Sequence, residues 1–376
     1  MKKLFFLSSI SLIVLSHSVN AFETLAKNAL LMDADTGHVI YEKQADIPMP
    51  PASMSKLMTA YMVFEALQNG KLSLDDEFTT SENAWKKGGA KSGSSTMFLK
   101  PYEKVKIKDL LRGIIVQSGN DACIVVAENM AGTEEAFAEL MNEKAREIGL
   151  ENSTFSNATG LPDANHKMSA KDLAKLAQLL INKFPEYYSI YSEKSFTYNG
   201  IKQGNRNPLL YTMDGADGLK TGHTETSGYG LTASAKTPDG RRLIMVLNGM
   251  KSMNERREES QKLMNWGVIG FENVLLIKKN QPIEKIPVWL GVSENVQAVA
   301  ETDFTLTVSK GRKVSPKMEI IYNSPIEAPV IKGQKLGTLI ISTDNGNKSL
   351  KLIAGDNVEK VGYFGKIKHI LLGLFK

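Results

Sequence analysis

The spacing of hydrophobic and polar positions changes along the chain, and each change predicts a different element. In "NALLMDADTGHVIYEK" (28–43) two apolar runs flank a turn from Ala34 to Gly37, which predicts a β-hairpin. Residues 53–69 then carry apolar side chains at helical spacing, and Gly70 follows as a stop signal. A helix is expected there, with a buried stripe formed by Met54, Leu57, Met58, Tyr61 and Met62.

Helical periodicity dominates the middle of the chain, and strand patterns return after it. Helices are expected at about 107–130, broken around Ser118-Gly119-Asn120, and at 133–148 and 169–182. Strands follow in "GLKTGHT" (218–224) and in "GYGLTASAKTPDGRRLIMVLNGM" (228–250), where Pro238-Asp239-Gly240 forms a turn; a helix at 255–271 comes last. Strands at both ends of a helical middle predict one antiparallel sheet with helices packed on it, a fold of the α/β class.

From about residue 274 the pattern changes to short apolar or alternating segments separated by Gly, Pro, Asn and Lys. This spacing is typical of a small all-β module, for which a spacer or partner-binding role is the simplest interpretation. The expected domains are therefore a signal peptide (1–21), a larger α/β domain (22–273), a C-terminal β-domain (274–360) and an amphipathic tail helix (361–376).

The first residues have the order of a secretory signal. Lys2 and Lys3 precede an apolar segment that runs from Leu4 to about Leu15, and small residues follow up to Ala21, after which cleavage is expected. A membrane-spanning anchor is the alternative, but the apolar core is shorter than the roughly 20 residues that a spanning helix needs. The sequence therefore predicts export.

The tail "GYFGKIKHILLGLFK" (362–376) combines one apolar helix face with lysines. Such a helix is typical of one that lies in a membrane interface, although it could instead pack on its own protein. Together with the export signal, this tail predicts a peripheral protein on the outer side of a membrane. The apolar face consists of Phe364, Ile367, Ile370, Leu371, Leu374 and Phe375.

Composition excludes several classes of site. The 376 residues have a net charge of +5, but no basic cluster interleaved with aromatic residues, so no nucleic-acid partner is expected. Cys123 is the sole cysteine, which rules out an intramolecular disulfide, and its apolar surroundings predict core packing. The five histidines do not cluster with it, so no metal and no cofactor are expected.

Ser53 and Lys56 stand one helical turn apart at the start of the first long helix. At 100° per residue they share one face at the shoulder of the buried stripe, where partial burial would favour a neutral lysine that can act as a base for the serine hydroxyl. The alternative is ordinary: Ser53 caps the helix and Lys56 is solvated.

Two further motifs favour the reactive serine–lysine pair over the helix cap. Ser118-Gly119-Asn120 interrupts a helix with a turn that bears a hydroxyl and an amide, and Lys220-Thr221-Gly222-His223 lies on a predicted strand whose glycine permits close backbone approach. The order S-x-x-K, S-x-N, K-T-G is typical of class A β-lactamases and penicillin-binding proteins.

Longer stretches extend the resemblance from about residue 22 to the C-terminus. The chain resembles the low-molecular-mass penicillin-binding proteins that are D-alanyl-D-alanine carboxypeptidases, whose middle motif is also Ser-Gly-Asn. The stretches that carry the resemblance are "PPASMSKLMT", "GSSTMFLKP", "LLRGIIVQSGNDACIVVAE", "FSNATGLPD", "GNRNPLLY", "DGLKTGHT" and "GYGLTASA".

The resemblance implies a penicillin-binding fold, an antiparallel sheet with a helical subdomain, and a role for each motif residue. Ser53 would be the acylated nucleophile and Lys56 its base, while Ser118 and Asn120 would relay a proton and hold the substrate amide. Lys220 would tune the electrostatics of the site. The backbone N–H groups of Ser53 and His223 would form the oxyanion hole, and the edge strand that includes Gly222 would pair with the substrate.

The same resemblance implies the partners. Thr221 and Arg256, which is adjacent to Arg257, would receive the terminal carboxylate of a peptidoglycan stem peptide ending in D-Ala-D-Ala, and Arg206 would lie near the site. β-Lactam antibiotics imitate that dipeptide and would acylate Ser53.

Three competing functions remain open at this stage. A class A β-lactamase would carry a glutamate between the second and third motifs, whereas residues 152–170 contain none. A D,D-endopeptidase of the same superfamily would use the same machinery on crosslinked peptides. An envelope scaffold with this fold would not be acylated at all.

Overall fold

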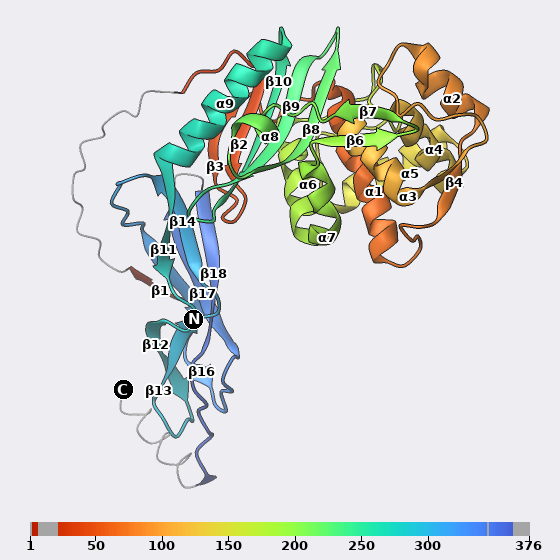
Figure 1. The fold of residues 1–376 in the computed structure, drawn as a ribbon. Helices are drawn as coiled ribbons and strands as arrows, with labels where there is room; N and C mark the ends of the chain where they lie inside the picture. The colour runs from red at the N-terminus through yellow and green to blue at the C-terminus, as the bar shows by residue number, and fades with distance from the viewer. Residues whose placement is uncertain (1, 7–21, 344–345, 364–376) are drawn as a thin grey trace. The chain divides into compact units, whose positions relative to one another are not determined.

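The computed structural model describes residues 2–6, 22–343 and 346–363, and the chain divides after Gly270 into two compact units (Figure 1). The predicted signal segment, apart from residues 2–6, and the predicted tail helix, apart from residues 361–363, lie outside the described residues. None of the helices within those ranges is long and apolar enough to cross a membrane.

The larger unit is built on a five-stranded antiparallel sheet with the order β3-β2-β10-β9-β8. The hairpin predicted at 28–43 is confirmed, and so is the pairing of the chain's early and late strands in one sheet. The strands are β2 (Asn28–Asp33), β3 (Val39–Lys43), β8 (Ala216–Thr224), β9 (Gly228–Lys236) and β10 (Arg242–Met250).

Both faces of this sheet are buried, because successive side chains along a strand point to opposite sides. Leu30 and Ile244 face the helical subdomain, whereas Leu31 and Met245 pack with Leu263 of α9 (Met253–Gly270) on the other face. Figure 1 shows α9 along one side of the sheet and α6 and α1 on the other. The sheet is thus a fixed floor between two hydrophobic layers.

The helices of the middle segment occur close to where the sequence predicts them. The break at Ser118 is present, and a π-helical turn, η3 (Gly113–Gln117), precedes it. The helices are α1 (Lys56–Gln68), α2 (Glu82–Gly88), α3 (Ile107–Arg112), α4 (Asn120–Ala131), α5 (Glu134–Glu147), α6 (Ala170–Lys183), α7 (Pro185–Tyr188) and α8 (Leu209–Thr212).

Short elements not predicted from the sequence complete this unit. They are the two-stranded pairs β4 (Glu77–Thr79) with β5 (Lys104–Lys106) and β6 (Ser195–Tyr198) with β7 (Ile201–Gly204), and the 3₁₀ turns η1 (Ala52–Ser55), η2 (Ala90–Ser92) and η4 (Ser189–Ser192).

The start of the first long helix differs from the prediction. Ser53 belongs to the 3₁₀ turn η1, and the α-helix begins only at Lys56. The predicted stripe residues are buried except Met62, which is half-buried, but α1 is buried on nearly all sides rather than on one face. Lys56 is therefore more deeply buried than the partial burial expected from the sequence, whereas Ser53 is half-buried.

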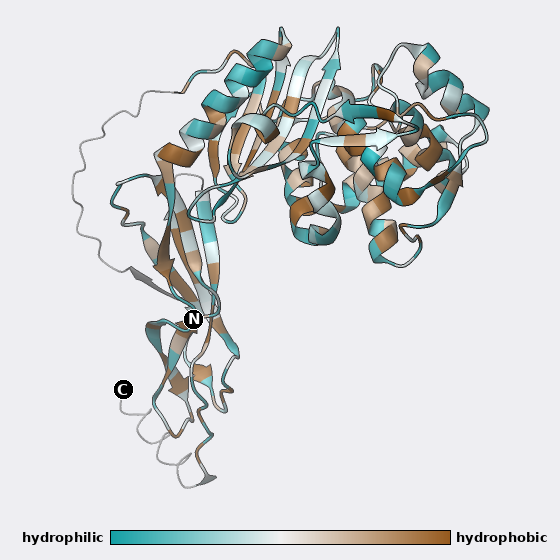
Figure 2. Cartoon of the chain, in the orientation of Figure 1, coloured by the Kyte–Doolittle hydropathy of each residue, from teal (hydrophilic) through white to brown (hydrophobic). Residues whose placement is uncertain are grey.

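The smaller unit is all-β, as predicted from residue 274 onward, and begins with β11 directly after Gly270. A seven-stranded sheet has the order β1-β15-β17-β18-β13-β12-β16, and β11 pairs with β14. Figure 2 shows hydrophobic segments along these strands. The bounds are β11 (Phe271–Ile277), β12 (Pro282–Trp289), β13 (Asn295–Ala300), β14 (Phe304–Ser309), β15 (Met318–Asn323), β16 (Ile326–Glu327), β17 (Lys335–Thr343) and β18 (Gly346–Ala354).

An additional edge strand comes from the N-terminus. β1 (Lys2–Phe6) pairs antiparallel with β15. Cleavage after Ala21 would remove β1 and leave β15 as the edge of this sheet.

Candidate active site

Ser53 and Lys56 lie in direct contact. Lys56 Nζ donates a hydrogen bond to Ser53 Oγ at 2.7 Å and another to the Thr159 carbonyl at 2.5 Å. In a 3₁₀ turn residues i and i+3 eclipse, which brings the two side chains closer than the α-helical 60° offset expected from the sequence. The predicted pair is thus brought together, and its amine is oriented by a backbone carbonyl.

The environment of Lys56 favours the neutral amine. Its side chain is 1% exposed, and burial lowers its pKa to about 8, with the positive charge of Arg206 acting in the same direction. A lysine whose pKa lies near neutrality can take up a proton from a hydroxyl, which an ordinary surface lysine cannot do at pH 7.

The turn at residues 157–160 presents the carbonyl that Lys56 contacts. Asn157 Oδ1 accepts three hydrogen bonds, from Thr159 N (3.1 Å), Thr159 Oγ1 (2.8 Å) and Gly160 N (2.8 Å). Gly160 has φ +79°, and a Cβ there would lie 2.1 Å from the Ala52 carbonyl. The hydrogen bonds to Asn157 fix the shape of the turn, and the glycine allows it to approach η1 closely.

A buried carboxylate supports the same turn. Glu134 accepts a hydrogen bond from Ala158 N at 3.2 Å and also pairs with Lys87. No residue of this support had an assigned role from the sequence, although the stretch "FSNATGLPD" was part of the resemblance. The sequence gives no sign of this support, because the contacts are made to backbone atoms, which are the same in every residue type.

Ser118 and Lys220 form the second contact of the site. Lys220 Nζ donates to Ser118 Oγ at 2.9 Å and to the Thr221 carbonyl at 3.1 Å. Ser118 has φ 62°, a left-handed conformation that ends the π-turn and points its hydroxyl at the lysine. Burial, together with the charge of Lys56, lowers the pKa of Lys220 well below its ordinary value.

Asn120 keeps one polar atom free for a ligand. Its Nδ2 donates to Ser94 Oγ at 2.9 Å, whereas its buried Oδ1 has no hydrogen-bond partner among the described residues. A buried acceptor without a partner is costly, and a substrate amide N–H would satisfy it. The next residue, Asp121, accepts hydrogen bonds from Met97 N (2.8 Å) and Leu99 N (3.1 Å), which fixes the start of α4.

The strand β8 joins the two contacts. It is the edge strand of the sheet, and a Cβ at Gly222 would lie 2.8 Å from the Pro51 carbonyl, so the glycine permits the close approach that the sequence predicted. Because η1 packs against β8, the Ser53 turn and the strand from Lys220 to His223 border the same space.

Two arginines extend the site. Arg206 Nη1 donates to Ser95 Oγ at 2.6 Å, and Arg256 Nη2 donates to the Arg206 carbonyl at 3.3 Å. Burial and the charge of Arg206 lower the pKa of Arg256 to about 10, and its buried Nε lacks a partner in the part of the chain that the structure describes. The neighbouring Arg257 is exposed and lies 3.9 Å from Glu258.

The end of β8 combines a buried hydroxyl with an exposed ring. Thr221 is 6% exposed, and His223 is exposed but stacks on Tyr229, with ring centroids 3.9 Å apart. Arg256 lies over the same Tyr229 ring at 5.7 Å. Tyr229 therefore links the end of the edge strand to the buried arginine.

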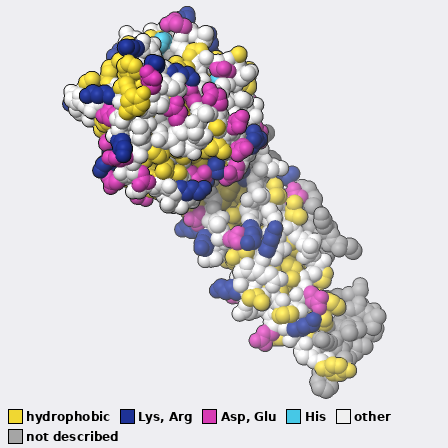
Figure 3. All heavy atoms as spheres, turned by 90° about the vertical axis from the view of Figure 1, so that its right-hand side faces the viewer, with side chains coloured by type: hydrophobic (Ala, Val, Ile, Leu, Met, Phe, Trp, Pro, Cys, Tyr) yellow, Lys and Arg dark blue, Asp and Glu magenta, His cyan; other side chains and the backbone are white. Residues whose placement is uncertain are grey.

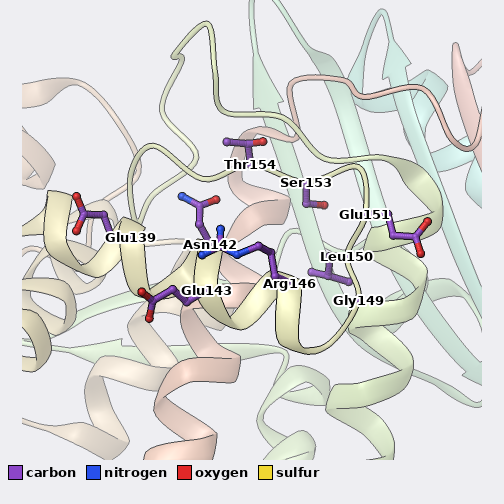
Figure 4. A pocket seen from close by; sticks show the side chains of 9 residues that line it. All are labelled: Glu139, Asn142, Glu143, Arg146, Gly149, Leu150, Glu151, Ser153 and Thr154. Atoms are coloured by element: carbon purple, nitrogen blue, oxygen red, sulfur yellow. The ribbon is translucent and has the colours of Figure 1, made fainter.

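Other features of the larger unit make none of these hydrogen bonds, although Cys123 lies near enough to Lys56 and Lys220 to interact with their charges. An open pocket of about 750 Å³ between α5 and the loop that follows it contains none of the motif residues (Figure 4). Cys123 is fully buried, and burial raises its pKa to about 12, so it is not a nucleophile. The described residues contain no cluster of His, Cys, Asp and Glu that could hold a metal ion.

Comparison with known proteins covers both units. The family profile described as D-alanyl-D-alanine carboxypeptidase matches residues 15–252, and the profile of the penicillin-binding protein 5 C-terminal domain matches residues 271–360. The chain is 41% identical over 356 residues to D-alanyl-D-alanine carboxypeptidase DacC of Escherichia coli, covering 93% of this chain and 88% of that protein.

Solved structures agree with these matches. Penicillin-binding protein 5 from Haemophilus influenzae has a TM-score of 0.82 at 37% identity, covering 91% of this chain and 100% of that one. Penicillin-binding protein D2 from Listeria monocytogenes, solved in an ampicillin-bound form, has a TM-score of 0.56 at 30% identity, covering 65% of this chain and 97% of that one.

Proposed function

We propose, on the premise that this chain belongs to the D-alanyl-D-alanine carboxypeptidase family, that it removes the terminal D-alanine from peptidoglycan stem peptides. The enzyme is a serine-type carboxypeptidase that penicillins acylate. The observation that carries the proposal is the contact of a buried, low-pKa lysine with a serine hydroxyl, Lys56 Nζ to Ser53 Oγ at 2.7 Å.

In the first step Ser53 Oγ attacks the carbonyl carbon of the penultimate D-alanine while its proton passes to Lys56. The negative charge that forms on the carbonyl oxygen is stabilised by the backbone N–H groups of Ser53 and His223. The C–N bond then breaks, and the leaving D-alanine takes up a proton that Ser118 relays. Its hydrogen bond to Lys220 supports this role for Ser118.

Substrate binding follows from the edge strand and the two arginines. A peptide end pairs its backbone with β8 across Gly222, as an added strand, and offers an amide N–H to Asn120 Oδ1. Its carboxylate lies near Thr221 and Arg256, whose guanidinium retains an unpartnered N–H. Arg206 adds positive charge and fixes Arg256 through its carbonyl.

Water then hydrolyses the acyl-enzyme and restores Ser53. The segment between the second and third motifs carries no glutamate at 152–170 that could activate this water as in class A β-lactamases. Penicillin is therefore expected to remain bound far longer than a β-lactamase would hold it.

The proposed location is the outer face of the inner membrane. The signal pattern supports export, and the basic amphipathic pattern of residues 362–376 supports peripheral attachment through the tail. On this proposal the catalytic domain is residues 22–273, and the β-domain (274–360) connects it to the attachment point.

Labelling with a fluorescent penicillin tests the nucleophile. Wild type should be labelled at one site, whereas Ser53→Ala should not be labelled at all. Ser55→Ala is the matched control, because Ser55 is a buried serine of the same 3₁₀ turn whose hydroxyl has no partner within the described ranges. Equal labelling of Ser53→Ala and wild type would exclude the proposal.

The substrate is tested separately. Purified protein should release D-alanine from an uncrosslinked pentapeptide and leave a crosslinked dimer largely intact. Cleavage of the dimer at a comparable rate would make the protein a D,D-endopeptidase with the same nucleophile.

A further inference from the structure

Exposed apolar side chains gather where three segments of the smaller unit meet. Trp289, Val292, Ile331 and Tyr363 are 47%, 70%, 66% and 76% exposed. We call these four residues the distal apolar surface. Figure 3 shows apolar side chains at the lower end of this unit.

Backbone hydrogen bonds hold the three segments together. Val292 N donates to the Glu359 carbonyl and Val361 N donates to the Leu290 carbonyl, which places the loop after β12 beside the last described segment. On the same segment, Val358 pairs with Val330, next to Ile331. Residues far apart in the sequence thus meet within one part of the fold, at residues 358–361, shortly before Tyr363.

Two of the exposed side chains, those of Val292 and Ile331, project from tight turns. Gln334 N donates to the Ile331 carbonyl at 2.9 Å, and Gly333 has φ +84°, so residues 331–334 form a β-turn with Ile331 as its first residue. Val292 lies in the loop that Val288 N closes by donating to the Glu294 carbonyl at 2.8 Å. Backbone hydrogen bonds fix both turns, so the turns keep their shape while their apolar side chains stay exposed.

The charges around this surface are mixed. Lys360 pairs with Glu327 at 2.8 Å, and the other charged residues of the three segments are Lys332, Glu294, Asp356 and Glu359, all exposed. Positive charge does not dominate, so attraction of an anionic partner is not the basis of binding here. The apolar side chains must supply the favourable free energy of binding.

We propose that the distal apolar surface inserts into the interfacial layer of a phospholipid bilayer, so that side chains of the β-domain contact the membrane in addition to the predicted tail helix, at whose start Tyr363 lies. Tryptophan and tyrosine prefer the boundary between headgroups and acyl chains, and Val292 and Ile331 supply apolar area beside them. The predicted tail helix begins at residue 361, within the segment that holds the two loops together, so the tail and these side chains would meet the same membrane.

A second protein fits this surface less well than a membrane. Stable protein interfaces need roughly 20–30 residues on each side, whereas four side chains from a strand end, two turns and the start of the tail offer far less. Insertion into a bilayer needs only that apolar side chains leave water, which requires no complementary shape.

Fluorescence of the full-length protein tests the contact directly. The chain has three tryptophans, and Trp85 and Trp266 belong to the larger unit, so Trp289 reports on this surface alone. With vesicles of phosphatidylglycerol and brominated phosphatidylcholine, bromine should quench part of the emission, and Trp289→Phe should lose that quenched part. Pelleting with the vesicles while wild type and Trp289→Phe are quenched equally would overturn the proposal and leave the tail contact intact.

Affinity provides the second measurement. Val292→Ser combined with Ile331→Ser should weaken vesicle binding by about tenfold, since two apolar side chains no longer leave water. The loss should persist in high salt, which screens only the lysines of the tail. Leu275→Ser is the matched control: Leu275 is 45% exposed on β11, which Figure 1 shows at the other end of this unit. An equal effect of Leu275→Ser, or no binding of wild type, would also overturn the proposal.

Discussion

Lys56 is fully buried, yet it holds its position through two acceptors, the Ser53 hydroxyl and the Thr159 carbonyl. These acceptors favour the ammonium form, whereas burial favours the neutral amine and dominates, so the pKa is lowered to about 8. A pKa of about 8 leaves a minor neutral fraction of Lys56 at pH 7, and on the proposed mechanism only this fraction can accept the proton of Ser53.

The rate of penicillin acylation should therefore rise with pH and level off above a midpoint near 8, because the neutral form of Lys56 accumulates as its proton dissociates. Stopped-flow measurements between pH 6 and 9.5 test this. Lys56→Arg should lower the rate by more than about 10²-fold, since arginine stays protonated. A flat profile in wild type would remove Lys56 as the base.

Asn157 should act as a positioning residue for Lys56. Its Oδ1 shapes the turn that presents the Thr159 carbonyl, so Asn157→Ala should slow acylation by about tenfold and move the pH midpoint down, because the ammonium of Lys56 loses a hydrogen-bond acceptor. Asn157→Asp keeps the acceptor and should restore most of the rate. An unchanged midpoint in Asn157→Ala would show that the turn has only a structural role.

The side chains of the site could be predicted from the sequence because each motif keeps its reacting groups within a few residues. Ser53 and Lys56 are three residues apart, and Lys220 follows a strand pattern. Asn157, Glu134 and the Thr159 carbonyl could not be predicted, because they act through backbone atoms or across the fold.

The loop between α5 and α6 contains a buried histidine whose charge the fold opposes. Burial lowers the pKa of His166 to about 4, with Lys56 and Lys167 acting in the same direction and Asp163 against it. Its Nδ1 accepts from Ser156 N at 3.2 Å, and its Nε2 has no partner among the described residues. The fold thus favours a neutral imidazole in the same loop that contains Thr159.

Acid should destabilise this loop through His166. Above about pH 6.5 His166 is neutral in both the folded and the unfolded chain, so the free energy of unfolding does not depend on it. As the pH falls toward 4, the unfolded chain takes up a proton at His166 and the folded chain resists it, which lowers the free energy of unfolding by about 3 kcal/mol. Denaturant unfolding at pH 7 and at pH 4 measures it, and His166→Gln should show a smaller difference between the two. An equal pH dependence in both proteins would contradict this origin.

Elements with a clear period were predicted well, and short ones were not. The β2–β3 hairpin has a turn between two apolar runs, and α5 repeats its apolar face over 14 residues. By contrast, α2 and the β6–β7 pair span only a few residues, too few for a period to show. The 3₁₀ turn η1 is set by its packing under Gly160 and Gly222, which lie far away in the sequence.

Across the whole molecule, the chain joins a unit with the catalytic contacts to a β-unit with its own hydrophobic core, which includes Ile286, Leu339 and Leu352. A separate core means that the β-unit does not depend on the site for its stability. Changes at the C-terminal end should then alter the membrane association of the protein without altering the rate of acylation.

Deleting residues 364–376, which leaves Tyr363 and the rest of the distal apolar surface in place, should therefore release most of the protein from the membrane fraction and leave the rate of penicillin acylation unchanged. Cell fractionation, followed by labelling of each fraction, measures both results at once. Retention of the shortened protein at wild-type levels would refute attachment through the tail.

Sealing the sole thiol in the core has a practical consequence. Cys123 is inaccessible to alkylating reagents in the folded protein, because it is fully buried and stays protonated. A cysteine introduced on the surface would thus be the single position that a maleimide dye modifies. Native protein can carry one probe at a chosen residue without removing any cysteine first.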